Sequence, residues 1–422
     1  MSDHDDWAVE GELPEHPVER GERLVSLDLI RGISVLGILF ANITAFAHPM
    51  LAYSWPGALP GGGNMADDII WLIQFIFVDG KFRGLFSLLF GAGMMLFMER
   101  VWARGGSRWL QARRLFWLML FGLAHFYLLF IGDILFIYAI SGFFALPMLR
   151  WTAARQLWSG LIWYVLGSLA LSGLLGATAA LEANPTASLE QSQQLSDGWQ
   201  SRVDEAAEET EVIQNGDYGD ILNYRFSNQS DHLAESIFTI LFETLPLMVL
   251  GMGLYRLGFF QSLSVTSRYV FWGWVGVIGG AVLNGFLGLW AMETGFAPFL
   301  TQFIFNGPSA FPRLGMILGI AALLTAWTPL IANSWLGSRC VAAGRMAFSN
   351  YIGTSLLMLL IFQGWAGGLY GQLHRLPLLP IVLLGWALML ICSKLWLDKY
   401  RYGPLEWLWR CLTYGTLFAI KR

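Results

Sequence analysis

Long apolar segments recur along the whole sequence, and they restrict the chain to a fold that lies in a membrane. A helix needs about 20 apolar residues to cross a bilayer, and ten segments of the 422-residue chain meet that need. A membrane β-barrel would show short segments of alternating polarity instead. We therefore expect an all-α, polytopic transmembrane helical bundle. The ten expected spans are 27–47, 82–100, 111–131, 133–149, 155–181, 232–255, 268–293, 313–333, 342–364 and 377–397.

Composition agrees with this fold and excludes several kinds of site. Charged residues make up only 13% of the chain, about half the fraction found in soluble domains. The three cysteines have no CxxC spacing, so we expect neither a disulfide framework nor a bound metal. The sequence also contains no Walker motif, no HExxH motif and no serine nucleophile elbow. The segment 66–79 is short and begins with acidic residues, so we expect an interfacial helix there.

The distribution of charge predicts how the helices are oriented. Basic residues gather in the connections 100–114, 150–155 and 256–268 and after residue 393, which share one face if the chain has ten spans. The positive-inside rule places that face, and both termini, in the cytoplasm. Nothing in this pattern supports nucleic-acid binding. The expected regions are an acidic disordered tail (1–25), an N-terminal transmembrane half (26–181), an acidic extracytoplasmic loop (182–231), a C-terminal transmembrane region (232–397) and an amphipathic cytoplasmic tail (398–422).

The first expected span carries Asp28, Arg31 and Asn42. Charge inside a membrane is costly, so it calls for a reason. Asp28 and Arg31 are three residues apart and can pair, and they could simply anchor the helix at the interface, where arginine reaches toward water. However, Arg31 and Asn42 share one helix face and lie about 16 Å apart along the axis. That face could instead guide an anionic ligand into the bilayer.

Further polar residues gather at the opposite level of the bundle. His125 precedes Asp133 by eight residues; a carboxylate could orient this imidazole as a general base, or His125 could bond a backbone carbonyl in a packed bundle. Glu243 lies three residues before Pro246, where it could bond backbone freed by the proline or carry protons. The other candidates at this level or inside spans are His48, Asp67, Asp68, Lys81, Arg83 and Asn350, with Arg345 at the cytoplasmic end.

Five stretches identify the chain as similar to the YeiB family of bacterial inner-membrane proteins, whose function is unknown. They run from the first span to the C-terminus and leave out the acidic tail and much of the loop 182–231. The stretches are SLDLIRGISVLGILFANITAF, GKFRGLFSLLFGAG, GLAHFYLLFIGDILFIYAISG, GRMAFSNY and YGPLEWLWRCLTYG.

The first span also resembles, more distantly, the first helix of heparan-alpha-glucosaminide N-acetyltransferase and of the type-three membrane acyltransferases. In the type-three group an arginine matching Arg31 is followed by a catalytic histidine, where this chain has Asn42; the glucosaminide enzyme also has asparagine there. The general base is the part of the pattern that departs from these enzymes.

The resemblance implies an acyl or acetyl transferase of the bacterial inner membrane. Its donor would be acetyl-CoA or another acyl-CoA, with Arg31, Arg113, Arg114 and Arg345 holding the CoA phosphates. His125, Asp133 and Asn42 would carry the chemistry. The acceptor would be a sugar, a lipid or another small molecule, and a homodimer stays open as an assembly. The substrate-binding candidates are Lys81, Arg83, Asp68, His48, Glu243 and Asn350.

Two other functions remain open from the sequence. A permease for an anionic or amphipathic solute would use Glu243 in a midplane cavity between two related halves. A scaffold or sensor would have lost its catalytic histidine. A transferase instead requires a cavity lined by Arg31 that reaches toward Asn42 and His125.

Overall fold

The structure is a computed structural model that describes residues 24–261 and 267–422. The expected acidic tail 1–25 lies almost wholly outside the described residues. The described chain is helical, with one isolated β-bridge between Tyr400 and Lys421. In chain order the first elements are α1 (Val25–Ala47), α2 (Leu51–Ser54), η2 (Pro56–Ala58), α3 (Met65–Phe77), α4 (Lys81–Ala103), α5 (Trp109–Leu128), α6 (Leu135–Ala145), η3 (Leu146–Arg150), α7 (Ala153–Glu182) and α8 (Leu189–Asn215). The others are α9 (Tyr218–Asn228), α10 (Asp231–Thr239), η4 (Ile240–Thr244), α11 (Leu245–Arg256), α12 (Ser267–Glu293), α13 (Pro298–Asn306), α14 (Ala310–Ile331), α15 (Trp335–Arg345), α16 (Ala347–Phe362), α17 (Arg375–Lys399) and α18 (Pro404–Tyr414).

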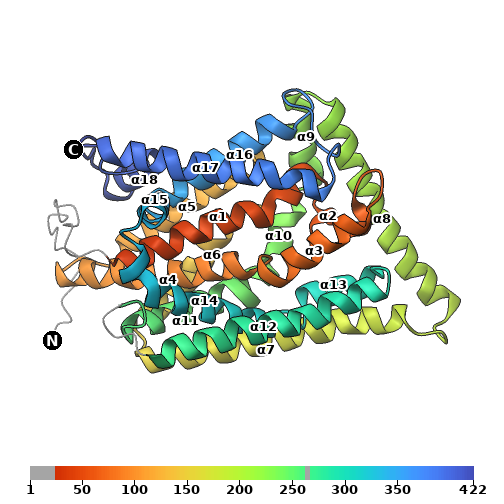
Figure 1. The fold of residues 1–422 in the computed structure, drawn as a ribbon, viewed down its shortest axis with the longest axis horizontal. Coiled ribbons are helices and arrows are strands. Elements are labelled where there is room, and N and C mark those ends of the chain that lie inside the picture. The colour runs from red at the N-terminus through yellow and green to blue at the C-terminus, as the bar shows by residue number, and fades with distance from the viewer. Residues whose placement is uncertain (1–23, 262–266) are drawn as a thin grey trace, which may run out of the picture.

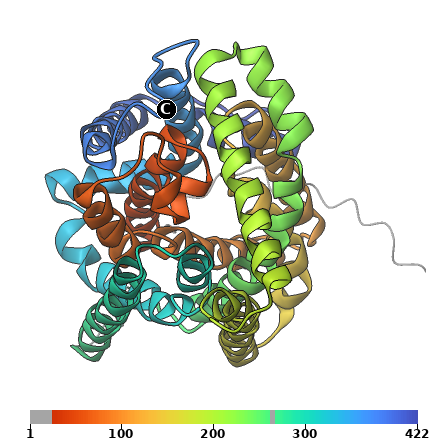
Figure 2. The same cartoon turned by 90° about the vertical axis from the view of Figure 1, so that its right-hand side faces the viewer.

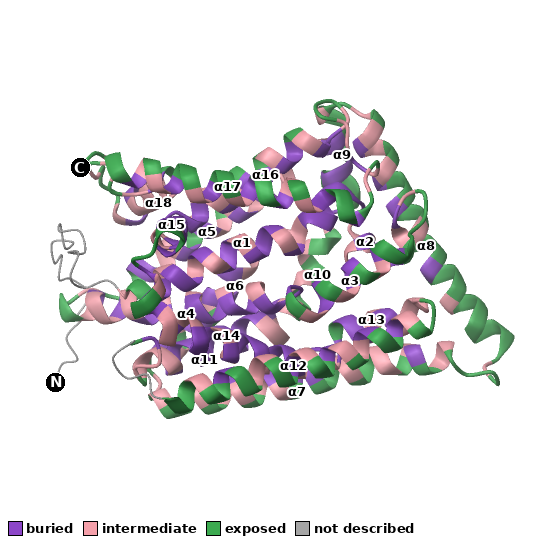
Figure 3. Ribbon diagram, in the orientation of Figure 1, coloured by how far each residue is buried: buried purple, intermediate pink, exposed green. Residues whose placement is uncertain are grey.

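The helices have the length and apolar character of a membrane protein. Seven helical segments of the described chain are long and apolar enough to cross a bilayer, and an eighth is the pair α15–α16, which bends by 88°. α5 and the short α6–η3 segment fall outside this set; polar residues within α5, among them Arg113, Arg114 and His125, lower its mean hydropathy. α7, α12 and α17 carry many exposed large apolar residues, and Figure 3 colours much of α7 and α12 as exposed or intermediate, as a lipid-facing surface requires. The protein is therefore a helical membrane protein.

α1 occupies the centre of the bundle (Figure 1) and is largely buried. It packs against α4, α14, α15, α16 and α17. The contact with α15 is close because Gly32 and Gly344 face the opposite backbone: a Cβ on Gly32 would meet the Cys340 carbonyl, and one on Gly344 would meet that of Asp28. Small residues at a helix interface permit this approach in membranes. The central position of α1 lets its polar side chains face protein rather than lipid.

Two elements close the ends of the bundle. α8 crosses the end of the bundle at which α1 terminates (Figures 1 and 2). The acidic segment 182–231, which contains α8 and α9, is largely helical. α18 lies at the opposite end, next to α5 and α16. Its Glu406 accepts hydrogen bonds from the backbone N–H groups of Phe348 and Ser349 at 2.8 and 3.0 Å, where a helix N-terminus favours a carboxylate. α18 is thus fixed to the start of α16.

The segment 66–79 differs in part from an isolated interfacial helix. α3 and α4 together form a 39-residue apolar segment, interrupted at Gly80, which has φ 73°. A Cβ on Gly80 would also collide with the Arg313 side chain. Glycine is therefore required here both for the left-handed backbone and for the approach of Arg313.

Gly91 of α4 and Gly251 of α11 lie where these two helices pack closely, and mutation can test this packing. A Cβ on Gly91 would meet the backbone of Met248, and one on Gly251 that of Leu88. Because backbone cannot move aside as a side chain does, Gly91→Ala should lower the free energy of unfolding by about 1–3 kcal/mol. Thermal unfolding in detergent measures this. Gly279→Ala is the matched control, since its Cβ meets nothing within 4 Å; equal melting temperatures for the two variants would contradict the packing.

Candidate functional site

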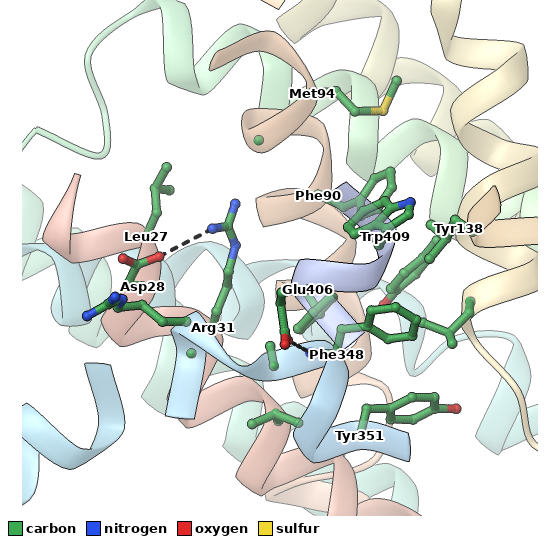
Figure 4. A pocket seen from close by; sticks show the side chains of 18 of the residues that line it. Leu27, Asp28, Arg31, Phe90, Met94, Tyr138, Phe348, Tyr351, Glu406 and Trp409 are labelled. Carbon is green, nitrogen blue, oxygen red and sulfur yellow. Dashed lines mark hydrogen bonds and ion pairs between the residues drawn. The ribbon is translucent and has the colours of Figure 1, made fainter. Parts of the chain in front are cut away.

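A cavity of about 350 Å³ lies at the end of the bundle that holds α18. We call it the arginine cavity, because five arginines line it. Figure 4 shows Arg31 beside Asp28 at one end and the aromatic side chains of Phe90, Tyr138 and Tyr351 at the other. Arg31 pairs with Asp28 at 3.4 Å, and its position in the cavity excludes a lipid-facing anchor. The five arginines are Arg31, Arg100, Arg114, Arg345 and Arg401.

The wall nearest α18 holds the arginines in place. The Arg114 guanidinium lies 4.3 Å from the centre of the Trp409 ring, a cation–π arrangement, and Trp409 donates its indole N–H to the Arg114 carbonyl at 2.8 Å. Arg345 donates to the carbonyl of Arg401 at 3.3 Å. Glu406 lines the same wall, and burial against α16 raises the pKa of its carboxyl although hydrogen bonds from Ser349 oppose this. The cavity therefore combines strong positive charge with an apolar interior.

A second cavity, of about 680 Å³, lies at the other end of α1. We call it the polar chamber. Glu243 binds two arginines there: Arg83 Nη2 at 2.7 Å and Arg313 Nη1 at 3.4 Å. At this cluster two guanidinium groups face one carboxylate, while Asp133 and Glu235 also line the chamber. Trp199 and Arg202 of α8 line the chamber as well. The chamber can hold a polar molecule with anionic or hydroxyl groups.

Only a few side chains separate the two cavities. Ile38 and Ile134 line both of them. A small void beside Ile38 is lined by Asn42, Tyr351 and Ser355, and Asn42 also faces the polar chamber. Arg31 and Asn42 thus lie at successive levels of one path along α1, as their spacing predicts.

His125 lies behind this boundary, buried between two oxygen partners: Ser355, which lines the small void, and Asp133, which lines the polar chamber. Its Nδ1 is 2.7 Å from Oδ1 of Asp133, and its Nε2 is 2.8 Å from Oγ of Ser355. Both the His125 and Asp133 side chains are almost fully buried. The other oxygen of Asp133 accepts the backbone N–H of Phe136 at 2.6 Å, which fixes the carboxylate. Of the two alternatives open from the sequence, the structure brings His125 to a carboxylate rather than to a backbone carbonyl.

Comparison with known proteins shows which sequences this chain resembles. A family model described as a protein of unknown function (DUF418) matches residues 254–416. The chain is 29% identical to the uncharacterized protein YeiB of Escherichia coli (strain K12), over 93% of this chain and 96% of YeiB. The chain is thus similar to YeiB along nearly the whole length of both proteins. It is also 29% identical to the uncharacterized protein YxaH of Bacillus subtilis (strain 168), over 94% of this chain and 96% of YxaH. No solved structure matches the chain.

Several residues expected at the site have other contacts in the structure. Lys81 is buried and donates to the Phe75 carbonyl. Asn350 donates to the Ala343 carbonyl and to Ser393 at 3.1 and 2.9 Å, which ties α16 to α15 and α17. Arg113 donates to the Leu412 carbonyl at 3.1 Å. None of the three lines either cavity, so their expected contacts with substrate or CoA are corrected to structural ones.

The acidic pair at the start of α3 and the histidine after α1 are corrected in the same way. Asp67 is buried and binds His374 Nδ1 and the Arg375 backbone N–H, both at 2.8 Å. Asp68 is partly exposed and lines neither cavity. His48 is buried near Arg375, and burial, helped by that guanidinium, lowers its pKa to about 4. His48 is therefore neutral at neutral pH and outside the cavities.

Sequence reasoning missed three arginines that line the two cavities and one serine, Ser355, that lines the small void between them. Arg100 and Arg401 were counted only as topological charges, and Arg313 only as the start of a span. Ser355 is a single serine in an apolar helix, which carries no signal of its own. One weak clue existed: Ser355 follows Tyr351 by four residues, so the two share a helix face.

Proposed function

We propose that this protein is a transmembrane acyl transferase of the bacterial inner membrane. It moves an acyl group from cytosolic acyl-CoA to a small-molecule, sugar or lipid acceptor on the other side. The observation that carries the proposal is the buried series Ser355–His125–Asp133, which connects the small void between the two cavities, lined by Ser355, with the polar chamber, lined by Asp133.

The orientation follows from charge. We place the end of the bundle that holds the arginine cavity on the cytoplasmic side, because the basic connections and the C-terminal tail lie at that end and the positive-inside rule assigns them to the cytoplasm. Ten crossings result if α5, the α6–η3 segment and the bent pair α15–α16 each count as one beside the seven apolar segments. Both termini are then cytoplasmic, and α8 lies outside.

The arginine cavity has the chemistry that acyl-CoA needs. Its arginines suit the phosphate groups of CoA, which guanidinium binds in bidentate fashion. The narrow pantetheine arm can follow α1 past Val35 and Ile38, which line the apolar end. A thioester carried from Arg31 toward Asn42 travels about 16 Å and arrives beside the Ser355–His125 pair. The His125 and Asp133 side chains are almost fully buried, and such shielding from solvent limits hydrolysis and strengthens polar interactions.

The polar chamber supplies the acceptor side. Arg83, Arg313 and Glu243 can bind acceptor hydroxyl or anionic groups and hold the nucleophilic atom toward Asp133 and Ile134, which line the chamber wall. His125, oriented by Asp133, takes the proton of the attacking group and returns one to the departing thiolate.

Transport is the second candidate, and one observation favours it. The two cavities meet at Ile38 and Ile134, which could act as a gate between alternately open states. Glu243, however, lies in the chamber with two arginine partners rather than in a shared midplane cavity.

Calorimetric titration with acetyl-CoA tests the donor site. We expect Arg31→Ala to weaken acetyl-CoA binding about 10–100-fold, because a hydrogen bond to a charged group contributes about 1.5–3 kcal/mol. Arg31→Lys, which keeps the charge but loses the bidentate geometry, should fall between. Arg104→Ala is the control, since Arg104 is exposed and outside the cavity.

Equal weakening by Arg31→Ala and Arg104→Ala would mean general attraction by a basic surface, not a CoA site. No binding of acetyl-CoA or of longer acyl-CoAs to folded protein would remove the transferase and leave the permease.

A further inference from the structure

Ser355 completes a hydrogen-bonded series that reaches from α16 through His125 to Asp133. We propose that Ser355 is the nucleophile of the transfer and that the acyl group passes through an ester on its Oγ. This inference rests on the proposed acyl transfer, and it adds a covalent intermediate to it. The residues come from three separate parts of the chain, α5, the turn before α6, and α16, which is why no local motif announces them.

The geometry assigns the protons. An ionised Asp133 can only accept hydrogen bonds, so Nδ1 of His125 carries the proton that lies between them. Nε2 is then an acceptor, and the hydroxyl of Ser355, 2.8 Å away, is its donor. A nucleophile bonded to a base that is itself oriented by a third group is the arrangement that activates serine. The Ser355 hydroxyl has a second acceptor in the Tyr351 carbonyl at 3.2 Å; because the hydroxyl has one proton, the reactive arrangement is the one that donates it to the nearer Nε2 of His125.

The position of Ser355 explains why a covalent intermediate is useful here. The donor and the acceptor occupy different cavities, separated by Ile38 and Ile134. Ser355 faces the void beside Ile38, which Val35 and Tyr351 of the arginine cavity and Asn42 of the polar chamber also line. A hydroxyl at this shared wall can accept the acyl group from one side and release it to the other. Donor and acceptor then need not meet in one cavity.

The chemical steps balance without another reactant. Ser355 Oγ attacks the thioester carbonyl carbon while its proton passes to His125 Nε2; the C–S bond breaks, and the proton goes from His125 to the CoA sulfur. An acceptor hydroxyl or amine then attacks the ester carbonyl and gives its proton to His125. The bond between Ser355 Oγ and the acyl carbon breaks, and His125 returns the proton to Ser355.

Asn42 is placed to stabilise the oxyanion of both steps. Its side chain borders both the void beside Ser355 and the polar chamber. An amide N–H at such a place can bind the carbonyl oxygen as negative charge develops, an interaction that contributes about 10²–10³-fold in comparable sites. Asn42 thus takes a part in catalysis other than that of the histidine found at this position in similar transferases.

Trapping the acylated protein tests the inference. The full chain in lipid nanodiscs is mixed with acetyl-CoA labelled in the acetyl group, quenched in acid and digested, and the labelled peptide is identified by mass spectrometry. We expect the label on Ser355 in the parent. Ser355→Ala should lose the label and lower thiol release by about 100-fold or more, whereas Ser355→Cys should keep both by forming a thioester. Ser141→Ala is the matched control, because this buried serine has no hydrogen-bond partner among the described residues.

The outcomes separate this inference from the function on which it rests. If acetyl-CoA binds and thiol release by Ser355→Ala equals that of the parent, the nucleophile is overturned and His125 acts directly on the acceptor. If acyl-CoA does not bind, the transferase fails first. A fluorophosphonate probe then tests the serine alone: labelling of Ser355 that is lost in His125→Gln supports an activated nucleophile, and absence of labelling overturns it.

Discussion

Replacing His125 by glutamine should lower the rate of acetyl-CoA turnover by about 10²–10⁴-fold, the usual contribution of a positioned base. Glutamine nearly fills the same space but cannot carry a proton between Ser355 and the leaving thiol. Affinity for acetyl-CoA should stay close to that of the parent, because His125 is not among the residues that line the arginine cavity. Thiol release and calorimetry, measured on the same preparations, check the two parts of the prediction.

Asp133→Asn is the companion variant. An amide would favour the tautomer with the proton on Nε2, which then cannot accept the proton of Ser355. In a serine protease triad the same change lowers kcat about 10⁴-fold. If His125→Gln or Asp133→Asn turned over acetyl-CoA as fast as the parent, neither residue would belong to the reaction. A fall in turnover together with a lower melting temperature would point to a structural role instead.

Glu243→Gln should destabilise the protein by about 3–5 kcal/mol, because it leaves two guanidinium groups without their carboxylate. Glu243 binds Arg83 and Arg313 at 2.7 and 3.4 Å, and the side chain of Arg313 is only 6% exposed. The loss is read from thermal unfolding in detergent. Glu243→Gln combined with Arg313→Met should recover much of the stability, since it removes one uncompensated charge.

Glu99→Gln is the control for this ion pair. Glu99 lies 3.7 Å from Arg256 and its side chain is 42% exposed; pairs of this kind contribute about 0–1 kcal/mol. If the Glu243→Gln and Glu99→Gln proteins had the same melting temperature, water would have to reach the arginines of the chamber. In that case the polar chamber would be an open vestibule and not an enclosed acceptor site.

The all-helical membrane fold could be predicted because apolar length alone determines it. A helix covers each of the ten predicted segments, but seven meet the length and apolar criteria outright. α5 shows the reason for the difference: the arginines and the histidine that give it chemistry also make it less apolar. The 88° bend between α15 and α16 was not predicted, since no proline stands at the break and the sequence there reads as one continuous span.

Contacts of the candidate site could be predicted only between residues that are close in the sequence. His125 and Asp133 lie eight residues apart across one tight turn, so their contact could be predicted locally. Ser355 comes 230 residues after His125, and only the tertiary packing of α16 on α5 and α6 brings it there. Lys81 and Arg83 illustrate the opposite error. Both open α4 and share a charge, but one points toward a backbone carbonyl and the other toward Glu243, a choice set by helix rotation.

One wall of the arginine cavity is made by residues that are synthesised late. Arg401, Tyr402, Glu406 and Trp409 line the cavity, and they are the last of its residues to leave the ribosome. α1, which provides the opposite wall, is the first. The helices can therefore be inserted while this cavity is still unfinished, and a chain cut short before residue 401 would reach the membrane without the wall that α18 provides. Completion of the cavity therefore requires synthesis of the chain through Trp409.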